Sequence, residues 1–200
     1  MNVTALKTAI FALACVPLAK VATDVFELFG GSLGANPVEA LLHRMGWWGL
    51  FFMLVTLTVT PLRNLTGMTS LVRVRRMLGL FAFTYIALHF TVYAVLDQGL
   101  AIRPIIEDIF KRPYITVGIA GLLLLLPLAI TSNSFSQRRL KQRWKKLHKL
   151  TYVIAVLGVW HFWWQVKKDA VEPMIFAGVL AILLGYRIVL WRRAKARKRG

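Results

Sequence analysis

Two histidines, His89 and His161, lie inside two separate apolar stretches of the chain. Imidazole is a common axial ligand of haem iron, and an ionisable residue within a membrane is costly and usually functional. His89 lies seven residues before Leu96 and His161 five before Val166, so both are roughly 8–10 Å inside the same membrane boundary at about 1.5 Å per residue. The pair predicts a haem held between two helices. Two histidines satisfied by interhelical hydrogen bonds are the alternative.

The elements that must position these histidines are predicted to be transmembrane helices. Of the 200 residues, 58% are hydrophobic and 17% charged, which is too apolar for a soluble domain unless much of the surface faces lipid. Stretches near the length that a hydrocarbon core of about 30 Å requires cover 46–61, 77–96, 114–130, 150–166 and 173–191. A further span over 8–29 is interrupted by Lys20, Asp24 and Glu27, with a signal peptide as the alternative. We therefore expect an all-α integral membrane protein with one domain over 1–200, a bundle of six transmembrane helices.

The charge distribution predicts the orientation of this bundle. Most of the 26 Lys and Arg residues lie in the amino-terminal segment, in the loops after the second and fourth spans, and in the carboxyl-terminal segment, which share one side of a six-span topology. All eight acidic residues fall on or near the other side. By the positive-inside rule, the basic side and both termini are cytoplasmic. Topology thus accounts for the net charge of +18 without nucleic-acid binding, and the lipid bilayer is the expected partner of these loops.

A third histidine, His148, indicates a further site on the cytoplasmic side. It precedes His161 by thirteen residues, or roughly 20 Å along a helix. Two-haem ferric-reductase-like domains would require a matching histidine near position 75 or 76, but the chain has Arg75 and Arg76 there. An arginine pair suits an anionic group such as a phosphate or a propionate. For His148, contact with a cofactor (including iron ligation) and an interfacial position without a ligand both remain open.

Seven segments, which are specific in their order and spacing, carry a resemblance to a known family. They are GANPVEALLHRMGWWGL (34–50), TPLRNL (60–65), LVRVRRMLGLFAF (71–83), LHFTVYAVLD (88–97), RPYITVGI (112–119), AITS (129–132) and RWKKLHKLTYV (143–153). They resemble MsrQ, formerly YedZ, the haem-binding membrane subunit of the bacterial MsrPQ methionine sulfoxide reductase system. The resemblance implies haem b, FMN, a location in the bacterial inner membrane, and electron transfer from membrane quinol to a periplasmic MsrP-like molybdopterin subunit.

Residue by residue, the resemblance assigns His89 and His161 to the family's intramembrane histidines and His148 to its third histidine. His43 also matches a family histidine. For His43, contact with quinone or the haem edge and a solvated position near a helix start both remain open.

Four arginines are candidates for holding a flavin phosphate. Arg73, Arg75 and Arg76 form the basic loop before the third span, and an ordinary positive-inside loop explains them equally well. Arg187 lies in the inner half of the last span and is a similar candidate, although its long side chain can also reach water from there.

The chain contains no motif for catalysis of its own. A single cysteine, Cys15, excludes an internal disulfide, a CxxC redox pair and a CxxCH haem attachment. We therefore expect an electron-transfer subunit, with substrate catalysis in the partner subunit. A self-contained ferric reductase and a transporter or structural membrane protein without redox function are the alternatives.

Overall fold

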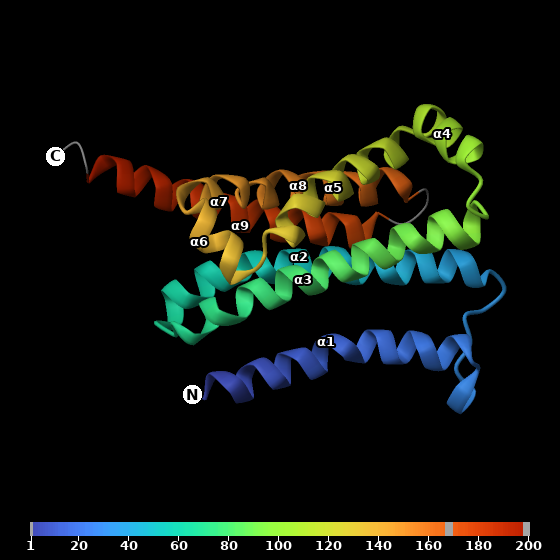
Figure 1. The fold of residues 1–200 in the computed structure, drawn as a ribbon, viewed down its shortest axis with the longest axis horizontal. Coiled ribbons are helices and arrows are strands. Elements are labelled where there is room, and N and C mark those ends of the chain that lie inside the picture. The colour runs from blue at the N-terminus through green and yellow to red at the C-terminus, as the bar shows by residue number, and fades with distance from the viewer. Residues whose placement is uncertain (1, 167–169, 198–200) are drawn as a thin grey trace.

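The computed structural model describes residues 2–166 and 170–197. Asp169, Lys198 and Arg199, which contribute to the charge pattern above, lie outside the described residues. Most of the described residues are helical and none forms a strand, so the all-α prediction is confirmed. Figure 1 shows long helices packed side by side, with both termini at the same end of the molecule.

Long helices form the bundle, and short helices lie at its two ends. The long helices are α1 (Val3–Val25), α2 (Pro37–Thr66), α3 (Ser70–Thr91), α5 (Pro113–Ile130), α8 (Leu150–Gln165) and α9 (Val171–Ala196). The short ones are η1 (Leu28–Gly30), η2 (Val92–Asp97), α4 (Ile102–Lys111), α6 (Ser134–Leu140) and α7 (Gln142–Leu147). Because η2 is a π-helical continuation of α3, these two form one rod.

Five described segments are long and apolar enough to cross a membrane. They are 3–25, 37–66, 70–97, 113–130 and 171–196. The sixth predicted span, 150–166, corresponds to α8, which has 16 residues. That is about 24 Å at 1.5 Å per residue, less than a hydrocarbon core of about 30 Å. The membrane character of the chain is therefore supported, and the count of six spans stays a prediction.

Several helices extend beyond the apolar stretches predicted as spans, because their caps lie beyond the apolar cores. The segment predicted over 46–61 begins after Asn36, whose side chain accepts a hydrogen bond from the Glu39 amide at 3.3 Å. It ends at Gly67, where φ is 71°. The spans predicted over 77–96 and 173–191 are likewise longer, and that predicted over 8–29 ends earlier, as the bounds of α3 with η2, α9 and α1 show.

Pro61 lies inside α2 without ending it, because a side chain from α9 replaces the hydrogen bond that proline cannot make. Proline has no N–H group, so the Leu57 carbonyl has no partner within its helix. Arg187 Nη2 donates to this carbonyl at 2.9 Å, and its Nη1 donates to the Tyr152 hydroxyl at 2.8 Å. One guanidinium thus connects α2, α8 and α9, which gives the intramembrane charge of Arg187 a structural role.

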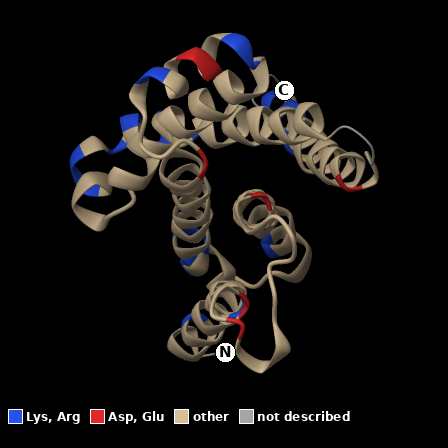
Figure 2. Cartoon of the chain, turned by 90° about the vertical axis from the view of Figure 1, so that its right-hand side faces the viewer, with Lys and Arg blue, Asp and Glu red and all other residues tan. Residues whose placement is uncertain are grey.

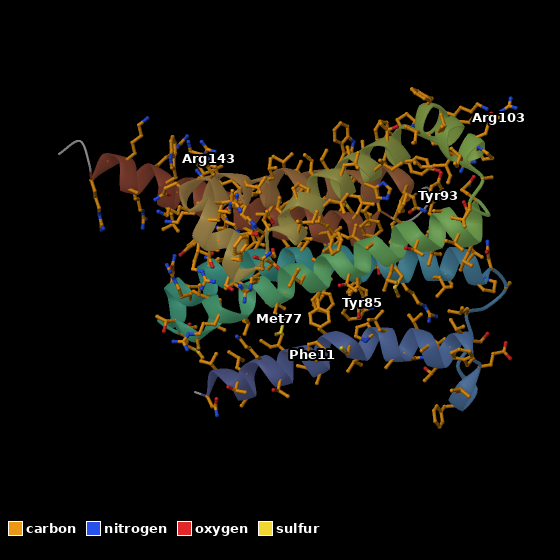
Figure 3. The ribbon with its side chains drawn as sticks, in the orientation of Figure 1. Phe11, Met77, Tyr85, Tyr93, Arg103 and Arg143 are labelled. Atoms are coloured by element: carbon orange, nitrogen blue, oxygen red, sulfur yellow. The ribbon has the colours of Figure 1, made fainter. Side chains whose placement is uncertain are left out.

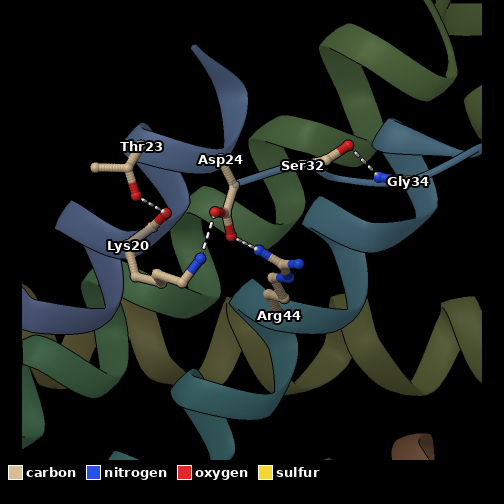
Figure 4. A network of polar contacts seen from close by, with 6 residues as sticks. All are labelled: Lys20, Thr23, Asp24, Ser32, Gly34 and Arg44. Carbon is tan, nitrogen blue, oxygen red and sulfur yellow. Dashed lines mark hydrogen bonds and ion pairs between the residues drawn. The ribbon is translucent and has the colours of Figure 1, made fainter. Parts of the chain in front are cut away.

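Helix α1 lies at the side of the bundle in Figure 1, where its apolar side chains pack against the core and polar contacts fix its position. Asp24 is 2% exposed and accepts from Lys20 Nζ on its own helix and from Arg44 Nη1 on α2 (Figure 4). Tyr85 points from α3 toward α1 (Figure 3), and its hydroxyl donates to the Ala14 carbonyl at 2.7 Å. Since a buried carboxylate is unfavourable unless it is paired, Arg44 fixes where the outer part of α1 meets α2.

The acidic side chains gather at one end of the bundle. In Figure 2 the red segments lie at the end that faces the viewer, which carries η1 and α4. By sequence, the described acidic residues lie in or next to the helix ends on this side, which are the end of α1, the start of α2, η2, α4 and the start of α9; they are Asp24, Glu27, Glu39, Asp97, Glu107, Asp108 and Glu172. We call this the acidic end. Both termini, the α2–α3 turn, α6 and α7 lie at the opposite end (Figure 1), which we call the basic end.

Candidate cofactor site

His89 and His161 come together between the helix pairs α2–α3 and α5–α8. Their ring centroids are 6.0 Å apart, and their planes are inclined by 80°. A metal bound by two imidazole nitrogens at about 2 Å each places the ring centroids about 6 Å apart. The two rings therefore fit a single metal between them.

Hydrogen bonds fix the direction of both imidazoles. His89 Nδ1 donates to the Leu42 carbonyl at 2.9 Å, and His161 Nδ1 donates to the Tyr114 carbonyl at 2.7 Å. Because a carbonyl oxygen only accepts, Nδ1 carries the proton in each ring and Nε2 keeps its lone pair. A carbonyl partner on one ring nitrogen is the usual way in which proteins orient an imidazole toward a metal.

A glycine lies against each imidazole on the neighbouring helix. A Cβ atom at Gly46 would lie 3.1 Å from His89 Nδ1, and one at Gly118 would lie 3.0 Å from His161 Cε1. Each glycine follows the accepting carbonyl by four residues, and donor and acceptor are 47 residues apart in both cases. The two helix pairs therefore repeat one arrangement, in which the absence of a side chain allows the ring to occupy its position.

Substitution of either glycine by Ala should disturb the cofactor without unfolding the helix. We expect Gly46→Ala and Gly118→Ala to lower bound haem or shift its absorption bands, because the new methyl group displaces the imidazole by a few tenths of an ångström. Gly178→Ala is the matched control, since a Cβ at Gly178 meets nothing within 4 Å. The absorption spectrum and haem content of the three purified variants provide the measurement. Equal values in all three would show that the glycines have no such role.

Both histidines line a cavity of about 430 Å³, within the usual range for ligand sites. Toward the middle of the bundle its walls are apolar and include Met53 and Ile154. Its polar lining residues lie toward the acidic end and are Asn36, Glu39, His43, Tyr93, Asp97, Arg112, Tyr114, Gln165 and Glu172. A flat iron macrocycle that is apolar over most of its surface and carries carboxylates at one edge fits this division.

His43 lies at the mouth of this cavity, at the acidic end. Its Nε2 is 2.9 Å from Gln165 Nε2, so the amide donates to the ring. The residue is exposed, yet it lines the same cavity as the histidine pair. The structure thus places His43 both near the candidate cofactor site and at an exposed position close to the start of α2, which fits both interpretations of its role.

His148 lies at the basic end, away from the histidine pair. The Thr131 hydroxyl donates to the Pro127 carbonyl at 2.6 Å, so it accepts from His148 Nε2 at 3.0 Å. The ring stacks on Trp144 with centroids 3.8 Å apart. Burial, together with the charge of Arg75, lowers the pKa of His148 to about 4. The imidazole is therefore neutral near pH 7, and its Nε2 is engaged within the protein.

The structure separates the arginines that the sequence groups together. Arg75 is half-buried and interacts electrostatically with both His148 and Arg187. Arg187 Nε is buried and makes no hydrogen bond to any described residue. Arg73 and Arg76 are exposed. Arg75, His148 and Arg187 thus form a second polar group, which we call the inner cluster, and the other two arginines lie outside it.

Two helix pairs that present one histidine each to a shared cavity define the transmembrane part of a ferric-reductase-type protein. Residues 45–159 match the protein family described as "Ferric reductase like transmembrane component". This match includes His89 and ends two residues before His161.

Similarity to individual proteins is higher and covers more of the chain. The protein-methionine-sulfoxide reductase heme-binding subunit MsrQ of Xanthomonas euvesicatoria pv. vesicatoria (strain 85-10) is 50% identical over 200 residues, which cover 98% of this chain and 91% of the relative. The subunit of the same name from Brucella anthropi is 52% identical over 169 residues, covering 84% and 75%. The chain belongs to the MsrQ family, as the sequence motifs predict. No solved structure matches it.

Proposed function

We propose that this chain binds haem b and passes electrons from membrane quinol across the bacterial inner membrane to a periplasmic, MsrP-like molybdopterin subunit. The observation that carries the proposal is the histidine pair, whose rings are 6.0 Å apart with both Nδ1 atoms bound to carbonyls. The relatives' designation as heme-binding subunits of a methionine sulfoxide reductase supports it.

The residues of this chain hold and insulate the redox centre. His89 and His161 would each supply an Nε2 atom to the iron, and the carbonyls of Leu42 and Tyr114 hold the proton on Nδ1, which leaves Nε2 free to bind metal. A haem bound there would supply one-electron redox chemistry. The apolar walls of the cavity exclude water, which favours a stable ligand set. Reduction of methionine sulfoxide takes place in the partner subunit.

The inner cluster is the proposed binding site for an anionic cofactor group, with the phosphate of FMN as the family-based candidate. Arg75 and Arg187 supply positive charge, and Arg187 Nε is a buried donor for which the described residues provide no acceptor. Hydrogen bonds between guanidinium and phosphate are strong because both groups are charged. His148 contributes its neutral ring at the edge of this cluster rather than a further positive charge.

A reduced-minus-oxidised spectrum of the purified protein tests the proposal most directly. The b-type bands of a bis-histidine haem are expected, followed by quinol-dependent reduction of a purified MsrP-like partner. A colourless protein would exclude the proposal and favour a transporter or structural role. Rapid reduction of ferric chelates without any partner, combined with no electron transfer to the partner, would favour a self-contained ferric reductase.

The proposed direction of electron transfer requires that the acidic end face the periplasm. Reporter fusions after Gly67 and Gln137 should therefore give a cytoplasmic signal, and fusions after Gly34 and Gln98 a periplasmic one. Gly34, Gly67 and Gln98 lie in connections at the two ends of the bundle, and Gln137 lies in the short helix α6. The corresponding positions Asp169 and Gly200 lie outside the described residues. A periplasmic signal after Gln137 would reverse or remove one of the spans.

A further inference from the structure

One cation lies among the polar residues at the mouth of the cavity. Among the described residues, Arg112 is the only Lys or Arg that lines the space between the two histidines and the acidic end. Three acidic side chains line the same mouth: Glu39, Asp97 and Glu172. A carboxylate entering this region would be repelled by these acids unless Arg112 received it.

The height of Arg112 in the bundle matches the edge of a cofactor centred on the histidine pair. Arg112 precedes Tyr114 by two residues, and the Tyr114 carbonyl binds His161. On α8, Gln165, which also lines the mouth of the cavity, follows His161 by four residues, which is about one turn or 5.4 Å. The mouth residues are therefore about one helical turn outside the metal position, on the side of the acidic end.

A buried acid, Asp108, holds the Arg112 side chain in position. Arg112 Nε is 3.3 Å from Asp108 Oδ1, and the Tyr93 hydroxyl donates to Asp108 Oδ2 at 3.2 Å. Asp108 is 9% exposed, whereas the Arg112 side chain is 51% exposed. Figure 3 shows Tyr93 and the neighbouring helix α4, with Arg103, at this end of the molecule. A guanidinium held through Nε presents its remaining N–H groups as a fork, which matches a carboxylate.

We propose that Arg112 binds a carboxylate group of the haem, so that the carboxylate edge of the cofactor faces the acidic end. This inference rests on the proposed haem function and adds the orientation of the cofactor and the residue that sets it. The opposite wall of the cavity is apolar, where an ionised carboxylate has no partner and is strongly disfavoured. The positive charge of Arg112 also stabilises the reduced haem, which carries one more negative charge than the oxidised form.

The test compares Arg112→Gln with Arg103→Gln in the full-length, detergent-solubilised protein. Arg103 lies on α4, pairs with Glu107 and is 91% exposed, and it does not line the cavity. We expect Arg112→Gln to weaken haem binding at least tenfold and to lower the ratio of reduced to oxidised haem at fixed potential. A tenfold change in this ratio corresponds to 59 mV for a one-electron couple. Arg103→Gln should change neither value.

Haem dimethyl ester separates recognition of the carboxylate from a general effect on folding. Wild-type apoprotein should bind haem more tightly than its dimethyl ester, and Arg112→Gln should bind the two equally. Asp108→Asn, which keeps the cation, should still prefer haem, and it serves as the second variant if Arg112→Gln does not fold. The proposal is overturned if Arg112→Gln retains the wild-type preference, or if Asp108→Asn loses it. If the wild type binds no haem at all, both the proposed function and this proposal are overturned.

Discussion

Replacement of His89 or His161 by Ala is expected to remove most of the bound haem. The two rings are 6.0 Å apart and each has its Nδ1 bound to a carbonyl, so each is placed to supply one Nε2 to the iron of the proposed haem. Loss of one ring leaves an apolar cavity in which water replaces the ligand poorly. Haem content per protein and the sharp bands of six-coordinate reduced haem b give the measurement.

His148→Ala is the matched control for this experiment, because its ring lies at the basic end and binds Thr131. We expect the spectrum of its haem at the His89–His161 pair, which we call the outer haem, to match that of the wild type. Added imidazole should partly restore the six-coordinate spectrum of His89→Ala and His161→Ala, since it fits the space of the deleted ring. If both variants keep the full haem content and an unaltered spectrum, the assignment of the two axial ligands is wrong.

The histidine pair could be predicted from the sequence, whereas the groups that orient its rings could not. Apolar length and residue counting place His89 and His161 at one depth. Which carbonyls they meet depends on the register between packed helices, which no local pattern encodes. A signal for the glycines does exist, because Gly46 and Gly118 precede their histidines by the same number of residues. Comparison of the two helix pairs with each other would have identified both.

Element boundaries and the short helices were harder to predict for a related reason. Apolar length locates the part of α2 that lies in lipid, but Asn36 and Gly67 end the helix outside that part. Helix α4 was missed because residues 102–111 are too short and too charged to be read as a span. Arg187 was interpreted as a ligand candidate or an interfacial side chain, and its contact with the Leu57 carbonyl follows from the three-dimensional position of Pro61.

The inner cluster also illustrates what packing adds to a charge pattern. In sequence, Arg73, Arg75 and Arg76 are equivalent members of one basic loop. In the structure, only Arg75 is half-buried and interacts with both His148 and Arg187. Because successive residues of a helix point in different directions, neighbours in sequence receive different roles. This difference turns a prediction about the whole loop into one about a single residue.

Arg75→Gln is expected to empty the inner site while leaving the outer haem intact. A hydrogen bond to a charged group contributes about 1.5–3 kcal/mol, so loss of the Arg75 guanidinium should weaken binding of an anionic cofactor group about tenfold or more. Acid-released flavin, measured by fluorescence, should fall accordingly, and quinol-driven reduction of the outer haem should slow. The haem spectrum itself should not change, because His148 and His161 are separated by roughly 20 Å along the chain's helical path.

Arg73→Gln provides the control that distinguishes a binding site from a topology signal. It removes the same positive charge from the same loop, but Arg73 is exposed and lies outside the inner cluster. If both variants insert normally and only Arg75→Gln loses flavin and slows reduction of the haem, the inner cluster holds the anionic group. Equal flavin content and equal reduction rates in the two variants would assign Arg75, like Arg73, to the positive charge that orients the protein in the membrane.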